Sequence, residues 1–118
     1  MATLSSHLLN SMDGTHAGNV TVSVVQIAPD GLRQEILNAA TDSGGRFAEQ
    51  IPLSDADAEC EFEMVIDSAA YFAARGQQPD TARIISQLIV RFRMADPDGK
   101  YHIPLMIAPN SYSVWWSS

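Results

Sequence analysis

Cysteine and basic residues are scarce in this 118-residue sequence, and both shortages narrow the range of possible functions. Cys60 is the only cysteine, so no internal disulfide can form, and we expect a reducing, cytoplasmic location. Seven Lys and Arg stand against 14 Asp and Glu, which gives a net charge of −7. Such a surface repels phosphate backbones and the sequence has no basic stripe, so no nucleic-acid partner is expected.

Long apolar runs, repeats and linkers are also absent from the sequence. No apolar stretch reaches the roughly 18 residues of a membrane-spanning helix, and the first residues lack the basic and apolar regions of a signal peptide. We therefore expect neither a membrane partner nor a targeting segment. With 46% hydrophobic and 18% charged residues, residues 1–118 are expected to form a single domain with its own core.

The common catalytic and cofactor motifs are missing as well. The sequence contains no nucleophile elbow, no Gly-rich phosphate loop and no dinucleotide fingerprint. Its three histidines and one cysteine stand at no spacing that suits a zinc site. We expect no metal and no cofactor.

What the sequence does contain is a period of two, which predicts β-strands. Apolar and polar residues alternate over 20–24, 60–66 and 88–94. Turn signals rich in Asp, Pro and Gly separate such runs at 29–31, 42–45 and 96–99. Arg91 and Arg93 lie on the polar side of their run, as a solvated strand face would have them. Short strands punctuated in this way indicate an all-β, antiparallel sandwich.

One segment breaks this pattern and predicts a short helix. Residues 67–76 begin with Asp67, continue through an alanine-rich stretch and end at Gly76. Aspartate is a favourable N-cap and glycine a favourable C-terminal residue. The overall expectation is a β-sandwich with one helix about midway along the chain.

Two histidines are predicted to point away from the core. In 101–107, His102 alternates with apolar neighbours, and His7 does the same between Leu4 and Leu8. Histidine exchanges protons near neutral pH, so this pair could line a cleft completed by another subunit, or could simply be surface residues. His16 lies in a loop between Gly14 and Gly18, and no role is assigned to it.

Five blocks of sequence, in order and spanning nearly the whole chain, carry a family resemblance. They are 4–10, 41–46, 67–76, 92–105 and 109–113, of which Phe92-Arg-Met-Ala-Asp-Pro-Asp98 followed by Tyr101-His-Ile-Pro-Leu105 is the most specific. Together they resemble the transthyretin-related 5-hydroxyisourate hydrolases. The resemblance implies a transthyretin-like, eight-stranded antiparallel β-sandwich with one short helix, assembled as a homotetramer that is a dimer of dimers.

The resemblance also implies an enzyme. Members of the family open the ring of 5-hydroxyisourate, a product of urate oxidation in purine metabolism, at channels between dimers. The family's catalytic residues correspond to His7, Arg46 and His102. Imidazoles can serve as base and acid in opening a cyclic amide or imide, and a guanidinium can orient an anionic heterocycle. Without the resemblance, Arg46 reads as a turn residue in solvent.

The C-terminus departs from the family. Where these hydrolases end in Tyr-Arg-Gly-Ser, this chain reads Trp115-Trp116-Ser117-Ser118. Strand alternation predicts that Trp116 and Ser118 share one face and Trp115 and Ser117 the other. Because indoles stack on planar ligands, Trp115, Trp116 and Ser118 are predicted to bind substrate, although the tryptophans could instead fill a subunit interface.

Two alternatives stay open beside the hydrolase. One is a diverged family member that acts on another planar heterocycle in specialised metabolism. The other is a non-catalytic tetramer that binds an aromatic ligand, as transthyretin does.

Overall fold

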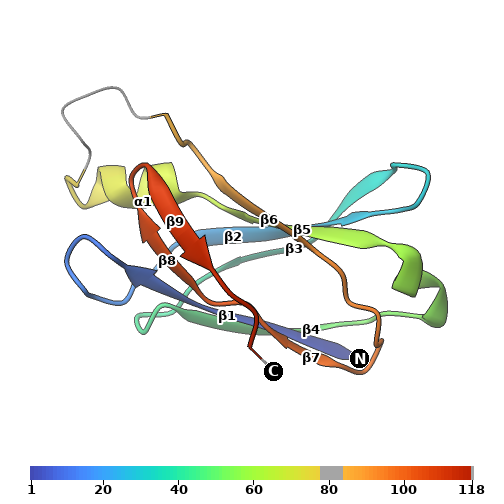
Figure 1. Ribbon diagram of the computed structural model, residues 1–118. Coiled ribbons are helices and arrows are strands. Elements are labelled where there is room, and N and C mark those ends of the chain that lie inside the picture. Colours follow the sequence, from blue (N-terminus) through green and yellow to red (C-terminus); the bar gives the residue numbers. More distant parts are fainter. Residues whose placement is uncertain (78–83, 118) are drawn as a thin grey trace.

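The computed structural model describes residues 1–77 and 84–117, and these form two β-sheets packed face to face (Figure 1). The β1 sheet has the order β4-β1-β8-β9, with β7 pairing β1, and the β2 sheet has the order β3-β2-β5-β6. The strands of the β1 sheet are β1 (Ala2–Asn10), β4 (Arg46–Ile51), β7 (Lys100–His102), β8 (Leu105–Ala108) and β9 (Ser111–Val114). Those of the β2 sheet are β2 (Thr21–Ile27), β3 (Arg33–Ala40), β5 (Glu61–Ile66) and β6 (Leu88–Phe92). The all-β sandwich predicted from the sequence is confirmed.

The period of two in the sequence determines which side chains fill the space between the sheets. In β1 every second residue is buried, from Ala2 to Asn10, while Ser5 and His7 lie on the outer face. The apolar residues of β2 and β5 point into the same core. In β6, Leu88 is buried and Ile89 is exposed, as predicted. Burial of this continuous apolar layer is the main source of stability.

The strand expected over 101–107 occurs as two pieces, β7 and β8. Both pair with β1 in one continuous register, with Ser5 beside His102 and Leu8 beside Leu105. Pro104 has no N–H to donate, so the ladder is interrupted there. If β7 and β8 are counted as one interrupted strand, the described residues contain eight strands, as expected. Their pairing with β1 is parallel, however, so the purely antiparallel expectation is wrong at this position.

The predicted helix is present as α1 (Ser68–Ala74), and a single 3-10 turn, η1 (Asp55–Glu59), precedes β5. The Asp67 carboxylate accepts a hydrogen bond from the Ala70 N–H at 3.4 Å and so caps the first turn. Gly76 follows with a φ of +66°, a conformation that favours glycine. Phe72 anchors α1 in the core. No helix in the described residues has the length and apolar character that crossing a membrane requires.

Candidate active site

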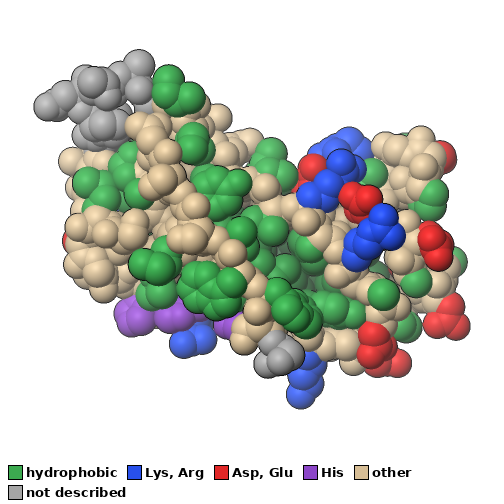
Figure 2. Space-filling model, viewed as in Figure 1, with side chains coloured by type: hydrophobic (Ala, Val, Ile, Leu, Met, Phe, Trp, Pro, Cys, Tyr) green, Lys and Arg blue, Asp and Glu red, His purple; other side chains and the backbone are tan. Residues whose placement is uncertain are grey.

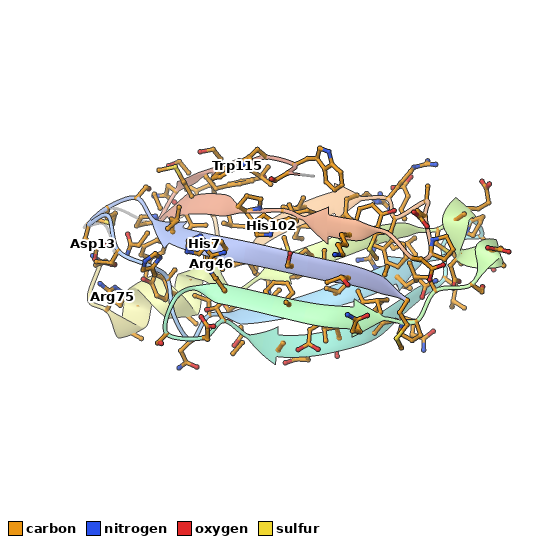
Figure 3. The ribbon with its side chains drawn as sticks, turned by 90° about the horizontal axis from the view of Figure 1, so that it is seen from below. His7, Asp13, Arg46, Arg75, His102 and Trp115 are labelled. Atoms are coloured by element: carbon orange, nitrogen blue, oxygen red, sulfur yellow. The ribbon has the colours of Figure 1, made fainter. Side chains whose placement is uncertain are left out.

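The outer face of the β1 sheet collects the residues singled out in the sequence. His7 on β1 lies directly opposite Arg46 on β4, and His102 on β7 lies beside Ser5 on β1. Paired residues in a sheet project to the same face, so the two imidazoles and the guanidinium share it. Figure 3 shows this face, with His7 and Arg46 next to each other and His102 further along the sheet.

A groove of about 350 Å³ runs across this face. It is open to solvent and contains two of the predicted catalytic side chains, Arg46 and His102. Its lining consists of Ser5, Ser6, Asp42, Arg46, Phe47, Ala48 and His102. The groove therefore offers a cation, an imidazole and a carboxylate to a small polar ligand, while the buried Ser6 hydroxyl donates to the Ile103 oxygen.

His102 is held by a side-chain hydrogen bond. Its Nδ1 lies 2.8 Å from the Ser5 hydroxyl oxygen, which comes from the neighbouring strand. This contact fixes the orientation of the ring and leaves Nε2 as the nitrogen that can face a ligand. Ser5 is thus a supporting residue that the sequence analysis did not single out. Its period-two spacing from His7 is the signal that places it on this face.

The surroundings of His7 favour its neutral form. Partial burial lowers its pKa from the ordinary value of 6.5, and the positive charges of Arg46 and the neighbouring imidazoles lower it further. A hydrogen bond with the Gly44 backbone acts in the opposite direction. A neutral imidazole can accept a proton, so His7 has the protonation state that a general base needs near neutral pH.

The turn between β3 and β4 holds Arg46 at the start of its strand. The Asp42 carboxylate accepts hydrogen bonds from the Gly44 N–H at 2.9 Å and the Arg46 N–H at 3.0 Å. These bonds, the one from the Arg46 backbone above all, lower the pKa of Asp42. The turn then closes at Gly45, whose φ of +76° favours glycine. Arg46 is therefore a strand residue opposite His7, and not only a turn residue in solvent.

His16, which received no role in the sequence analysis, lies against His7. Its Nδ1 is 2.9 Å from Nε2 of His7, and the two rings stack with their centroids 5.0 Å apart. The chain folds back after β1, so that Leu9 and His16 form an isolated antiparallel bridge. The Asp13-Gly14 turn signal was present in the sequence. A hairpin about that turn would have brought His16 to the His7 face.

The two tryptophans lie on different faces of the β1 sheet. Hydrogen bonds from the Trp115 N–H to the Pro104 oxygen, at 3.3 Å, and from the Ser117 N–H to the His102 oxygen, at 2.9 Å, continue the pairing of β9. Trp115 and Ser117 therefore share the outer face with His102. Ser118 lies outside the described residues.

Trp116 is on the inner side of this sheet. Its ring lies 5.6 Å from that of Tyr101, measured between centroids. Both rings line an apolar groove of about 240 Å³ between the edges of the two sheets, together with Val90, Phe92, Arg93, Ile103, Val114 and Trp115. The structure thus brings His7, Arg46, His102 and Trp115 to one face, and it does not bring Trp116 there.

Charged and potentially metal-ligating side chains are distributed unevenly over the surface. Figure 2 shows histidine side chains gathered at one edge of the molecule beside a Lys or Arg side chain. Within the β2 sheet, Arg91 and Arg93 form ion pairs with Glu61 of β5, which fits the predicted solvated face. Within residues 1–77 and 84–117, no three His, Cys, Asp or Glu side chains are placed to hold a metal ion together.

Comparison with known proteins gives a consistent set of relatives. A sequence model of the family described as HIUase/Transthyretin family matches residues 4–116. The 5-hydroxyisourate hydrolase of Pseudomonas aeruginosa is 27% identical over 119 aligned positions, covering 100% of this chain and 93% of that protein. Klebsiella pneumoniae 5-hydroxyisourate hydrolase superposes with a TM-score of 0.77 at 26% identity, covering 98% of this chain and 99% of that one. Sea bream transthyretin in complex with thyroxine superposes with a TM-score of 0.80 at 25% identity, covering 97% and 93%.

Proposed function

The chain belongs to the HIUase/transthyretin family, and we propose that it is a hydrolase that opens the ring of 5-hydroxyisourate or of a closely related planar heterocycle. Relatives that match it over its full length are named 5-hydroxyisourate hydrolases. The observation that carries the proposal is the shared outer face of His7, Arg46 and His102. A family member that had lost its chemistry would have no need of these three side chains in one place.

The proposed reaction adds water across a cyclic carbon–nitrogen bond. His7, kept neutral by its surroundings, takes a proton from water as the new carbon–oxygen bond forms at the ring carbonyl carbon. The carbon–nitrogen bond then breaks, and His102 supplies the proton that the leaving nitrogen needs. One water is consumed: its hydroxyl goes to the carbonyl carbon and its proton to His7. The imidazoles regain their starting states when His7 releases a proton to solvent and His102 takes one up.

Arg46 and Asp42 have different parts in this proposal. The Arg46 guanidinium lines the groove and would bind an anionic ring and stabilise charge on the carbonyl oxygen. Asp42 also lines the groove, but its Oδ1 accepts hydrogen bonds from the Gly44 and Arg46 N–H groups, so its proposed part is to support the arginine. Neither proposed step uses a metal or a cofactor.

The assembly proposed for residues 1–118, acting as one domain, is a homotetramer. The groove of about 350 Å³ is open in one chain, and a second copy over the outer face of the β1 sheet would close it. Closure removes water and strengthens the electrostatic interactions inside.

The single cysteine, Cys60, is buried and unpaired, which favours a reducing compartment such as the cytoplasm.

A second function is favoured by Trp115, which is 44% exposed on the same face. An indole at this position suits a flat aromatic ligand. The chain would then be a binding protein, or a hydrolase of a different planar heterocycle. The likeness to transthyretin in complex with thyroxine fits the binding alternative.

The test is a direct assay of ring opening. Urate and urate oxidase generate 5-hydroxyisourate, whose ultraviolet absorbance decays slowly without a catalyst. We expect the protein to accelerate the decay and His102→Gln to reduce the acceleration about 100-fold or more, because general acid–base catalysis contributes on that order. Arg33→Gln, on β3 of the other sheet, is the control and should keep the activity. No acceleration together with tight binding of planar aromatics would replace the hydrolase with the binding protein.

A further inference from the structure

The imidazole pair formed by His7 and His16 is not explained by the proposed reaction, which uses only His7. We propose that His16 is a positioning residue for His7: it holds the His7 ring in one orientation and keeps the pair from carrying more than one positive charge. The inference rests on the proposed function only for the role of His7 as a base. The contact itself can be tested without any turnover.

The geometry of the pair restricts its protonation. Nε2 of His7 and Nδ1 of His16 are 2.9 Å apart, a hydrogen-bond distance. One of these nitrogens must therefore donate and the other must accept. If both rings were protonated, two N–H groups and two positive charges would face each other. The contact can therefore form only while at least one of the two rings is uncharged.

The other charged groups around His7 act in the same direction. Arg46 on β4 and His102 on β7 both disfavour a positive charge on His7. Asp42, in the turn before Arg46, is the acidic group that faces this cluster, and it is engaged by backbone N–H groups. Partial burial also favours the neutral ring. His16 adds a side-chain hydrogen bond to the ring, beside the hydrogen bond with the Gly44 backbone, and the two together fix the orientation of the ring.

The segment that carries His16 is held in place at both ends. The Asn10 N–H donates to the Thr15 oxygen at 2.8 Å, and the Ala17 N–H donates to the Leu8 oxygen at 2.9 Å. His16 therefore lies in a hairpin that returns along β1. A histidine in a loose loop would not keep a constant distance from His7.

Asp13 ties the tip of this hairpin to the end of α1. Its carboxylate accepts hydrogen bonds from the N–H and the hydroxyl of Thr15, and from the side chains of Arg75 at 2.6 Å and Gln77 at 3.0 Å. Figure 3 shows Asp13 and Arg75 close together at one end of the molecule. The position of His16 thus depends on a network that reaches from β1 to α1.

Two substitutions separate orientation from charge. His16→Ala removes both the hydrogen bond and the second titrating ring, whereas His16→Gln keeps a hydrogen-bonding side chain and removes only the ring. Because the full chain has three histidines, His16→Ala together with His102→Gln assigns all three imidazole signals in its NMR spectrum. The His7 pKa can then be read from a pH titration of each full-length variant.

We expect both variants to raise the pKa of His7 by roughly half a unit, since one cause of its lowering is removed. A raised pKa leaves more His7 protonated at a given pH, so the acid limb of kcat/KM moves to higher pH by the same amount. For His16→Ala we also expect kcat to fall about 3- to 10-fold with KM nearly unchanged, because a misplaced base loses orientation. His16→Gln should recover part of kcat while keeping the shifted profile.

An unchanged His7 titration in both variants would overturn the proposal, even in a protein that hydrolyses the substrate. A shifted titration in a protein without turnover would support the pairing and count against the hydrolase. Asp13→Asn gives an independent measurement, because it weakens the bond to Arg75 and leaves both rings intact. It should move the His7 titration in the same direction by a smaller amount, and Arg33→Gln should not move it.

Discussion

Trp115 and Trp116 are neighbours in the sequence, yet they belong to different parts of the molecule. Trp115 follows the pairing of β9 onto the face that carries His102, while Trp116 turns inward to Tyr101. Both remain exposed in one chain, at 44% and 57%. Both tryptophans line the apolar groove at the sheet edges, and Trp115 alone is also placed by strand alternation on the outer face, where a ligand could reach it.

This separation predicts unequal effects of removing the two indoles. Trp115→Ala should raise KM about 2- to 10-fold, because an aromatic stacking contact contributes about 0.5–1.5 kcal/mol. Trp116→Ala should change KM less and should mainly lower thermal stability, since the Tyr101 contact is lost. Steady-state kinetics and thermal unfolding of the two variants measure the difference. A larger rise of KM for Trp116→Ala than for Trp115→Ala would contradict the assignment of Trp115 to the ligand face.

For single residues, the sequence predicted the face of the sheet on which a side chain lies better than it predicted which side chains it contacts. The outward directions of His7 and His102 followed from strand periodicity, and the structure has them on the outer face. The contact between His7 and His16 depends on a hairpin that the Asp13-Gly14 turn signal marks, but that signal does not specify the register that sets Leu9 opposite His16. The opposite faces of Trp115 and Trp116 followed from alternation, but which face carried the histidines depended on the register between β9 and β8. The binding roles of Trp115, Trp116 and Ser118 stay predictions.

Among the connecting elements, the 42–45 turn has the strictest requirements. It joins β3 to β4, and it packs directly against β1 and the returning hairpin. The Leu8 N–H donates to the Gly45 oxygen at 2.7 Å. A Cβ atom added at Gly45 would lie 2.4 Å from the Leu8 backbone oxygen. The close approach that places Arg46 opposite His7 is thus possible only with glycine at position 45.

A matched pair of glycines tests this requirement. Gly45 and Gly14 both have a φ of +76°, but a Cβ at Gly14 would meet no atom within 4 Å. Gly14→Ala should therefore cost only the conformational penalty, about 1–2 kcal/mol of unfolding free energy. Gly45→Ala should cost about 2–4 kcal/mol, because the clash with β1 is added. Urea unfolding of both variants gives the comparison, and equal losses would show that the turn can relax away from β1.

At the scale of elements, most of the fold could be predicted from the sequence. The strands of the β2 sheet and the single helix have local signals, namely alternation, an N-cap and a terminal glycine. The division between β7 and β8 comes from Pro104, and the parallel pairing of β1 with both comes from long-range topology. Neither the order of strands nor the direction of a pairing is encoded in a short segment, so these features needed the structure or the family resemblance.

The whole molecule presents an unusual surface on the outer face of the β1 sheet. The polar groove with Arg46 and His102 lies next to apolar side chains at the β8 and β9 edge, including Met106, which is 41% exposed, and Trp115. Figure 2 shows exposed hydrophobic side chains close to the histidines. A surface that is apolar at one end and cationic at the other is suited both to a planar anion and to a second copy of the chain.

The proposed tetramer requires this face to be covered, and Met106→Arg tests that requirement. The side chain of Met106 lies on the same face as His102, so an arginine there would be buried without a partner if two copies meet. We expect the mass in solution to fall from about four times the chain mass of 12.8 kDa to about twice that mass. Ring opening should fall at least about tenfold, because the groove would stay open to water. Analytical ultracentrifugation and the absorbance assay provide the two measurements.

The control for this substitution lies on the opposite side of the molecule. Ile89 on β6 is 47% exposed, close to the value for Met106, but it projects from the outer face of the β2 sheet. Ile89→Arg introduces the same charge and removes a similar apolar side chain, so a general effect of charge or stability would appear in both variants. If only Met106→Arg lowers both the mass in solution and the rate of ring opening, assembly and catalysis both depend on the outer face of the β1 sheet. If Met106→Arg dissociates the protein and keeps its activity, one chain carries a complete site, and closure by a second copy is not part of the mechanism.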